Sequence, residues 1–190
     1  MSDSVSMSAA RERLLNAADS LFRERGYERV GINEIIATAD IAKATFYQHF
    51  KSKEALCDEW LRRLTEVSIR SSNQLLEDPR PVRERLEARY EALRTWLKED
   101  NFPGCPYCVT ACMTDLGSEL RKPVEEARRS AREFWRTLAA QHEQKQKKAK
   151  NLGDAWFLLY TGAITEARNV HSLWPLKKAL AASIALGGWQ

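Results

Sequence analysis

The chain has 190 residues, enough for one large domain or for a small domain joined to a medium-sized one. Hydrophobic residues make up 44% and charged residues 29%, an ordinary balance for a globular protein. The longest apolar run, residues 155–160, is too short to cross a bilayer, and the first residues lack the apolar segment of a signal peptide. We therefore expect a cytoplasmic protein with reduced thiols. The net charge of +4 is too small to indicate nucleic-acid binding by itself.

The N-terminal third of the chain predicts four helices. Apolar residues at helical spacing run from Leu14 to Phe22, and Gly26 is a typical stop signal. Two short helices are expected over residues 33–39 and 43–50. Ser52 is placed to cap a long helix that extends to about Gln74.

The rest of the chain predicts about five more helices. Prolines, glycines and polar stretches separate its apolar stripes, and no segment alternates as a strand would. The polar tract 142–151 is expected to be a solvated helix end and loop. The predicted helices lie at residues 86–97, 107–116, a longer segment with Pro123 in its first turn, 152–170 and 176–186. The predicted fold class is all-α, with about nine helices.

One short stretch, residues 41–53, differs from the rest of the N-terminal region in its charge. It holds three lysines, a histidine, a tyrosine and two phenylalanines, and no acidic residue. Residues 1–60 together hold eight Lys/Arg and ten Asp/Glu, so the positive charge is local. A segment without carboxylates is suited to face a polyanion such as duplex DNA.

The arrangement of residues 33–50 as helix, short turn and helix is that of a helix-turn-helix. Phe46 and Phe50 share one sector of the second helix and are expected to pack against the first helices. Ala44 and Gln48 point the opposite way, where a helix in the major groove reaches base edges. Residues on the flanks, Lys43, Tyr47 and His49, lie where phosphates would be.

Residues 10–60 resemble the DNA-binding domain of the TetR family of bacterial transcriptional regulators. The matching segments are LLNAADSLFRERGYERV and INEIIATADIAKATFYQHFKSKEAL, and the run K-A-T-F-Y-x-H-F-x-S-K-E agrees in order, spacing and residue type. The resemblance implies contacts to the DNA backbone by Lys43, Thr45, Tyr47 and Lys53. It implies base reading by Ala44, Gln48 and His49.

Two positions depart from the family pattern. Asp40 stands where the turn usually has glycine, and aspartate tolerates the left-handed conformation better than most residues do. Ala42 stands where a serine often caps the second helix, which forfeits about 1 kcal/mol. Neither change removes the surface expected to face DNA.

The segment FPGCPYCVTAC holds three of the four cysteines, Cys105, Cys108 and Cys112. The first two have the C-x-x-C spacing of thiol-disulfide oxidoreductases, but no strands are predicted for the βαβ frame that this chemistry uses. A thiol sensor using Cys105 and Cys108, a zinc site and a plain apolar core remain as alternatives. We expect no enzyme activity, no cofactor and no bound metal.

The predicted helices after residue 56 resemble, in layout only, the ligand-binding and dimerisation domain of the family. In the family a small molecule binds among the middle helices. Residues that would line such a pocket, or equally fill a core, are Tyr90, Leu93, Trp96, Cys108, Cys112, Trp135 and Leu138.

The last two predicted helices carry apolar faces that suit a homodimer interface. A single recognition helix reads few base pairs, whereas two related by a dyad read a palindrome. The candidate interface residues are Trp156, Leu159, Ala163, Ala167, Val170, Leu180 and Ile184.

The sequence thus predicts a helix-turn-helix domain at 1–55, with 1–9 as a flexible tail, and an effector-binding and dimerisation domain at 56–190. The expected function is that of a repressor which a small-molecule effector releases from a palindromic DNA operator. The alternative is a thiol- or metal-responsive regulator using the three cysteines at 105, 108 and 112. No membrane partner is expected.

Overall fold

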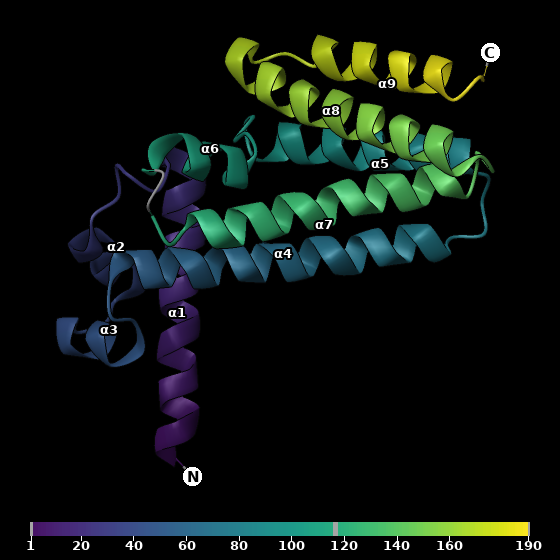
Figure 1. The fold of residues 1–190 in the computed structure, drawn as a ribbon. Helices are drawn as coiled ribbons and strands as arrows, with labels where there is room; N and C mark the ends of the chain where they lie inside the picture. Colours follow the sequence, from purple (N-terminus) through teal and green to yellow (C-terminus); the bar gives the residue numbers. More distant parts are fainter. Residues whose placement is uncertain (1, 116–117, 190) are drawn as a thin grey trace. The chain divides into compact units, whose positions relative to one another are not determined.

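The computed structural model describes residues 2–115 and 118–189, which form nine helices and no strand (Figure 1). This confirms the predicted all-α class and its number of helices. The helices are α1 (Ser2–Arg25), α2 (Ile32–Ala39), α3 (Lys43–His49), α4 (Lys53–Glu77), α5 (Val82–Glu99), α6 (Pro106–Met113), α7 (Arg121–Ala140), α8 (Gln146–Val170) and α9 (Trp174–Leu186).

The chain divides into two compact units. Unit 1 comprises Met1–Thr65 with Pro106–Glu125, and unit 2 comprises Glu66–Cys105 with Glu126–Gln190. Unit 1 therefore contains the helix-turn-helix segment together with α6, which follows it only after about forty intervening residues of unit 2. The mobility of the predicted tail, residues 1–9, stays a prediction; α1 begins at Ser2, and Met1 lies outside the described residues.

The core of unit 1 forms behind α3. Phe46 is completely buried and Phe50 nearly so, and their ring centroids lie 6.1 Å apart. Both belong to one apolar cluster with residues of α1 and α2, as the helical spacing predicts, and with residues of α4. The other buried members are Leu14, Leu15, Ala17, Ala18, Leu21, Phe22, Val30, Ile35, Ala39, Leu56, Cys57, Trp60, Leu61, Leu120 and Val124.

Polar contacts fix the start of α4 and its approach to α1. The Ala55 amide donates to Ser52 Oγ at 3.1 Å, so Ser52 caps the helix as predicted. The indole nitrogen of Trp60 donates to the Asp19 carboxylate of α1 at 2.7 Å. Gly26 ends α1 at a φ of 81°, a backbone conformation that glycine adopts without a steric penalty.

Unit 2 is built around α5, α8 and α9. Helices α8 and α9 form an antiparallel pair (Figure 1). Trp156 is completely buried and donates from its indole nitrogen to the Ser183 carbonyl at 2.9 Å. The hydroxyl groups of Tyr90 and Ser183 lie 3.0 Å apart. Each buried polar atom in this group thus has a partner, which an apolar core requires.

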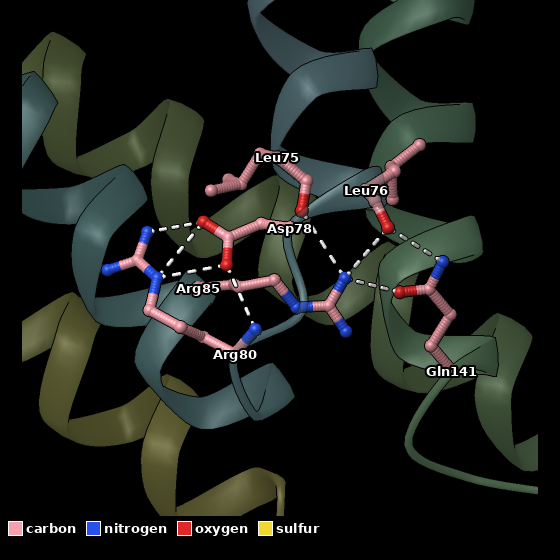
Figure 2. Close-up of polar contacts among 6 residues, drawn as sticks. All are labelled: Leu75, Leu76, Asp78, Arg80, Arg85 and Gln141. Atoms are coloured by element: carbon pink, nitrogen blue, oxygen red, sulfur yellow. Dashed lines mark hydrogen bonds and ion pairs between the residues drawn. The ribbon is translucent and has the colours of Figure 1, made fainter.

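A buried arginine holds the C-terminal end of α4 (Figure 2). Arg85 is 6% exposed and donates from Nη1 to the carbonyl oxygens of Leu75 and Leu76, at 3.3 and 2.9 Å. It also donates to Gln141 Oε1 at 2.6 Å, and Gln141 in turn donates to the Leu76 carbonyl. The last carbonyls of a helix lack intrahelical donors and carry partial negative charge, so a guanidinium satisfies both needs.

The largest difference between a predicted and an observed helix boundary is at the start of α8. Helix α6 also ends at Met113, before its predicted end at about residue 116, which itself lies outside the described residues. Helix α8 begins at Gln146, six residues before the predicted start, so the tract 142–151 is half helix. The reason is tertiary packing, because Ala149 is buried and the Gly153 backbone lies against α7. Among the described residues, none of the helices has the length and apolar character needed to span a membrane.

Candidate nucleic-acid interface

Helix α3 presents a face without acidic residues to solvent. Lys43, Ala44 and Gln48 are exposed, and Tyr47 keeps 48% of its surface accessible although it is aromatic. Phe46, on the opposite side, is completely buried and makes an edge contact with the Tyr47 ring. The buried phenylalanine therefore fixes the orientation of the helix, and the remaining side chains are available to a partner.

The turn between α2 and α3 is held in a left-handed conformation. Asp40 has φ 51° and ψ 57°, as predicted for the position that replaces glycine. The Asp40 amide bonds back to Ala37 and the Ile41 amide bonds back to Ile36. Arg13 of α1 donates to the Asp40 carbonyl at 2.5 Å and to its carboxylate at 3.1 Å. The arginine ties the turn to α1 and offsets the charge of the acid at the edge of the surface.

The start of α3 has no side-chain cap. Ala42 occupies the N-cap position in an extended conformation and makes no capping hydrogen bond, as the sequence indicates. With seven residues the helix is too short to be stable alone. Its conformation therefore depends on the packing of Phe46 and Phe50 in unit 1.

Lys53 has a contact that sequence reasoning does not reveal. Its ammonium group donates to the Tyr27 carbonyl at 3.1 Å and lies 4.2 Å from the centroid of the Tyr27 ring. Burial, with Cys57 as the next contributor, raises the pKa of Tyr27 to about 12, so this ring stays neutral. An ammonium has three donors, so a phosphate contact remains open to Lys53.

The other flank of α3 includes His49 and Thr45, both half-buried. The Nε2 atom of His49 is buried and has no hydrogen-bond partner in the described structure. A base contact by this nitrogen would require the side chain to rotate. His49 thus differs from Ala44 and Gln48, whose side chains are exposed without rearrangement.

The segment that contains this interface matches a known protein family. Residues 14–59, which contain all of α2 and α3, match the model of the bacterial regulatory proteins of the tetR family. These residues therefore carry the DNA-binding domain of the TetR family.

Relatives extend the TetR likeness over most of the chain. The HTH-type transcriptional repressor NemR of Escherichia coli is 26% identical over 180 residues, or 90% of each chain. The HTH-type transcriptional activator FasR of Mycolicibacterium smegmatis is 35% identical over 91 residues, 48% of this chain and 42% of that protein.

Solved structures share the fold along nearly the whole chain. The reduced form of Escherichia coli NemR superposes with a TM-score of 0.81 at 23% identity, covering 93% of this chain and 97% of that one. SCO4454, a TetR-family regulator from Streptomyces coelicolor, gives a TM-score of 0.82 at 22% identity, covering 95% of each chain.

The candidate pocket residues fall in both units. Tyr90, Leu93, Trp135 and Leu138 are buried in unit 2, and Trp96 is half-buried there. Cys108 and Cys112 belong to α6 of unit 1, where the former is half-buried and the latter exposed. The role of this set in effector binding stays a prediction.

The candidate dimer residues divide into buried and accessible groups. Trp156, Ala163 and Ala167 are buried by their own chain. Leu159, Leu180 and Ile184 are half-buried, and Val170 is exposed. Other large apolar side chains that are exposed on α8 and α9 are Leu158, Trp174 and Leu186.

The cysteines are thiols in distinct surroundings. Cys57 is buried in unit 1, and burial raises the pKa of its thiol well above the usual range, although Lys53 opposes this. Cys105 is buried in unit 2, and Arg128 Nη1 donates to its sulfur at 4.0 Å. Within the described part of the chain, no three His, Cys, Asp or Glu side chains gather as metal ligands would.

Two contacts of functional interest lay beyond sequence reasoning. Arg13 and Asp40 are separated by 27 positions, and Lys53 and Tyr27 by 26. Helical periodicity relates residues three or four positions apart, so it carries no signal for such pairs. Only the assembled unit brings them together.

Proposed function

We propose that the protein is a homodimeric transcriptional repressor that binds a palindromic operator and is released by a small-molecule effector. The observation that carries this proposal is the exposed, acid-free face of α3, held in place by the completely buried Phe46. Repression is the activity named for NemR, to which the chain is similar over 90% of its length.

The readout of DNA is assigned to two groups of residues. Ala44 and Gln48 lie on the exposed face and would enter the major groove, where the amide of glutamine can pair with adenine. Lys43, Thr45, Tyr47 and Lys53 would contact phosphates and set the register without reading sequence. His49 would add a base contact after rotation of its ring.

The short length of α3, the helix that would read the bases, is the argument for a dimer. A helix of seven residues covers only a few base pairs, so useful specificity requires two copies related by a dyad. The exposed apolar side chains Leu158, Val170, Trp174 and Leu186 of α8 and α9 provide surface for the second copy. Effector binding would change the separation of the two α3 helices, provided that the effector binds the two conformers unequally.

Selection of bound fragments from a random duplex library tests the proposal. We expect a palindrome whose half-sites lie at least one helical turn apart. Gln48→Ala should weaken operator binding by about 1–3 kcal/mol and leave random DNA nearly unaffected. Gln74→Ala, an exposed glutamine on α4, is the matched control. If Gln48→Ala binds the palindrome as tightly as the natural chain does, Gln48 does not read bases.

A thiol-responsive form of the same regulator is the second candidate. The guanidinium of Arg128 beside the Cys105 sulfur favours it, because reactive cysteines commonly have cationic neighbours. Rates of iodoacetamide labelling, followed by mass spectrometry, should rank Cys105 above Cys57, because burial raises the pKa of the Cys57 thiol well above its usual range. Operator affinity should fall after labelling in the natural chain and persist in Cys105→Ser. Labelling that leaves operator affinity unchanged would reject this candidate.

A further inference from the structure

Three partly buried arginines of unit 2, Arg89, Arg128 and Arg168, lack an acidic partner among the described residues. Arg80, Arg132 and Arg136 of the same unit all bond to carboxylates at 2.6–2.7 Å. Arg89, Arg128 and Arg168 have no carboxylate within 4.0 Å among the described residues. An anionic ligand would supply the ion pair that these three guanidinium groups lack among the described residues.

Arg89 lies close to two aromatic rings. Its guanidinium carbon is 5.3 Å from the centroid of Phe134 and 5.5 Å from that of Tyr160. Its Nε atom is buried without a hydrogen-bond partner in the described structure. Burial raises the pKa of Tyr160, against the opposing effect of Arg89, so the phenol stays neutral and cannot balance the arginine. A buried donor of a charged group without a partner is costly, and an anionic ligand would relieve that cost.

Arg128 of α7 contacts a third aromatic residue, on the same helix as Tyr160. It donates from Nη2 to Thr161 Oγ1 at 2.8 Å, and its guanidinium carbon lies 4.5 Å from the centroid of Phe157. Its Nη1 reaches the sulfur of Cys105, a residue that also acts electrostatically on Tyr160. Phe157, Tyr160 and Thr161 are three and four positions apart on α8, so they share one face of that helix. Arg89 and Arg128 therefore contact the same face.

Arg168 lies against Gly104, the residue immediately before Cys105. Gly104 has a φ of 79°, and a Cβ added there would lie 2.5 Å from Arg168 Cδ and 3.0 Å from its Nη1. Arg168 follows Thr161 by seven residues, which is two helical turns on the same face of α8. The Arg168 side chain thus lies next to the loop that contains Cys105, the residue that Arg128 contacts.

From this juxtaposition we propose that Arg89, Arg128 and Arg168 form a binding site for an organic carboxylate. Guanidinium groups match the carboxylate fork with two parallel hydrogen bonds. The rings of Phe134, Phe157 and Tyr160 would contact an aromatic or other apolar body of the ligand. The proposal rests on the proposed function, because it identifies the chemical class of the effector that releases the operator.

Calorimetric titration with benzoate and with its neutral isostere benzamide, at constant ionic strength, tests this site without DNA. Benzoate should bind at least about tenfold more tightly than benzamide, because one charge-assisted hydrogen bond corresponds to about that factor. Arg128→Gln should weaken benzoate binding about tenfold or more. Arg129→Gln, an exposed arginine on the same helix, is the matched control and should bind like the natural chain.

Several outcomes would overturn the proposal. They are equal affinities for benzoate and benzamide, no binding of benzoate, or equal losses in Arg128→Gln and Arg129→Gln. Should Arg128→Gln fail to fold, as judged by circular dichroism, the half-buried Arg168→Gln takes its place with the same expected loss. Operator selection uses the protein without benzoate, so a protein that binds DNA but not benzoate contradicts only this inference. Benzoate binding without operator binding would contradict only the proposed function.

Discussion

The Lys53→Met variant separates two roles of one side chain. Methionine keeps the apolar stem against Tyr27 but removes the ammonium that donates to the Tyr27 carbonyl at 3.1 Å. A hydrogen bond from a charged donor contributes about 1.5–3 kcal/mol, and a partly exposed cation–π contact about 0.5–1 kcal/mol. Because Lys53 is only half-buried, we take the low end and expect a loss of about 1–2 kcal/mol in the free energy of unfolding.

The same variant should alter the salt dependence of DNA binding. Each phosphate contact contributes about 0.9 to the slope of log affinity against log salt concentration, so the slope should fall by about one. Urea denaturation measures the first effect and fluorescence anisotropy across salt concentrations the second. Lys178→Met, an exposed lysine on α9, should change neither. A lowered stability with an unchanged slope would refute the phosphate role, and an unchanged stability would refute the structural one.

Three further variants probe unit 2. Gly104→Ala places a side chain at positive φ against Arg168 and should lower the free energy of unfolding by about 1–2 kcal/mol, measured by thermal unfolding. Gly31→Ala, where a Cβ has open space, should lower it by under about 0.5 kcal/mol. Equal losses in the two variants would contradict the steric argument. Arg85→Leu removes the donor to the last carbonyls of α4 and should lower the free energy of unfolding by about 2–4 kcal/mol, measured by urea denaturation. A loss under about 0.5 kcal/mol would contradict the capping role of Arg85. Hydrogen bonds from Arg132 and Arg136 lower the pKa of Asp154, so its contribution to stability is present above about pH 4 and lost as the pH falls further; acid titration of Asp154→Asn should show a shallower loss there than the natural chain.

Much of the fold follows from local patterns in the sequence. The buried stripe of α1, the stop at Gly26, the cap at Ser52 and the left-handed Asp40 all rest on residues within a few positions of one another. Such signals act over one helical turn and survive in the folded chain. The exposed face of α3 was predictable for the same reason, since Phe46 and Gln48 differ by about 200° around the helix.

Other features depend on parts of the chain that are far apart in sequence. The lysine-rich start of α8 looks like a loop, yet it is helical because Gly153 permits close contact. A Cβ at that position would lie 2.5 Å from Arg136 Cα. The partners of Arg85 include Gln141, 56 residues away, and no periodic pattern marks such a pair. Packing between distant segments decided these features, and local propensity was overridden.

The composition of unit 1 limits how the DNA-binding half could be produced alone. Its apolar cluster includes Leu120 and Val124, which enter the chain more than fifty residues after Leu61, the last buried member of the N-terminal segment. A fragment ending at residue 65 would leave the partners of these two side chains exposed to water. A stable DNA-binding fragment would need residues 106–125 joined to residues 1–65 through an artificial linker. A chain truncated after residue 65 would expose its apolar core and be prone to aggregate.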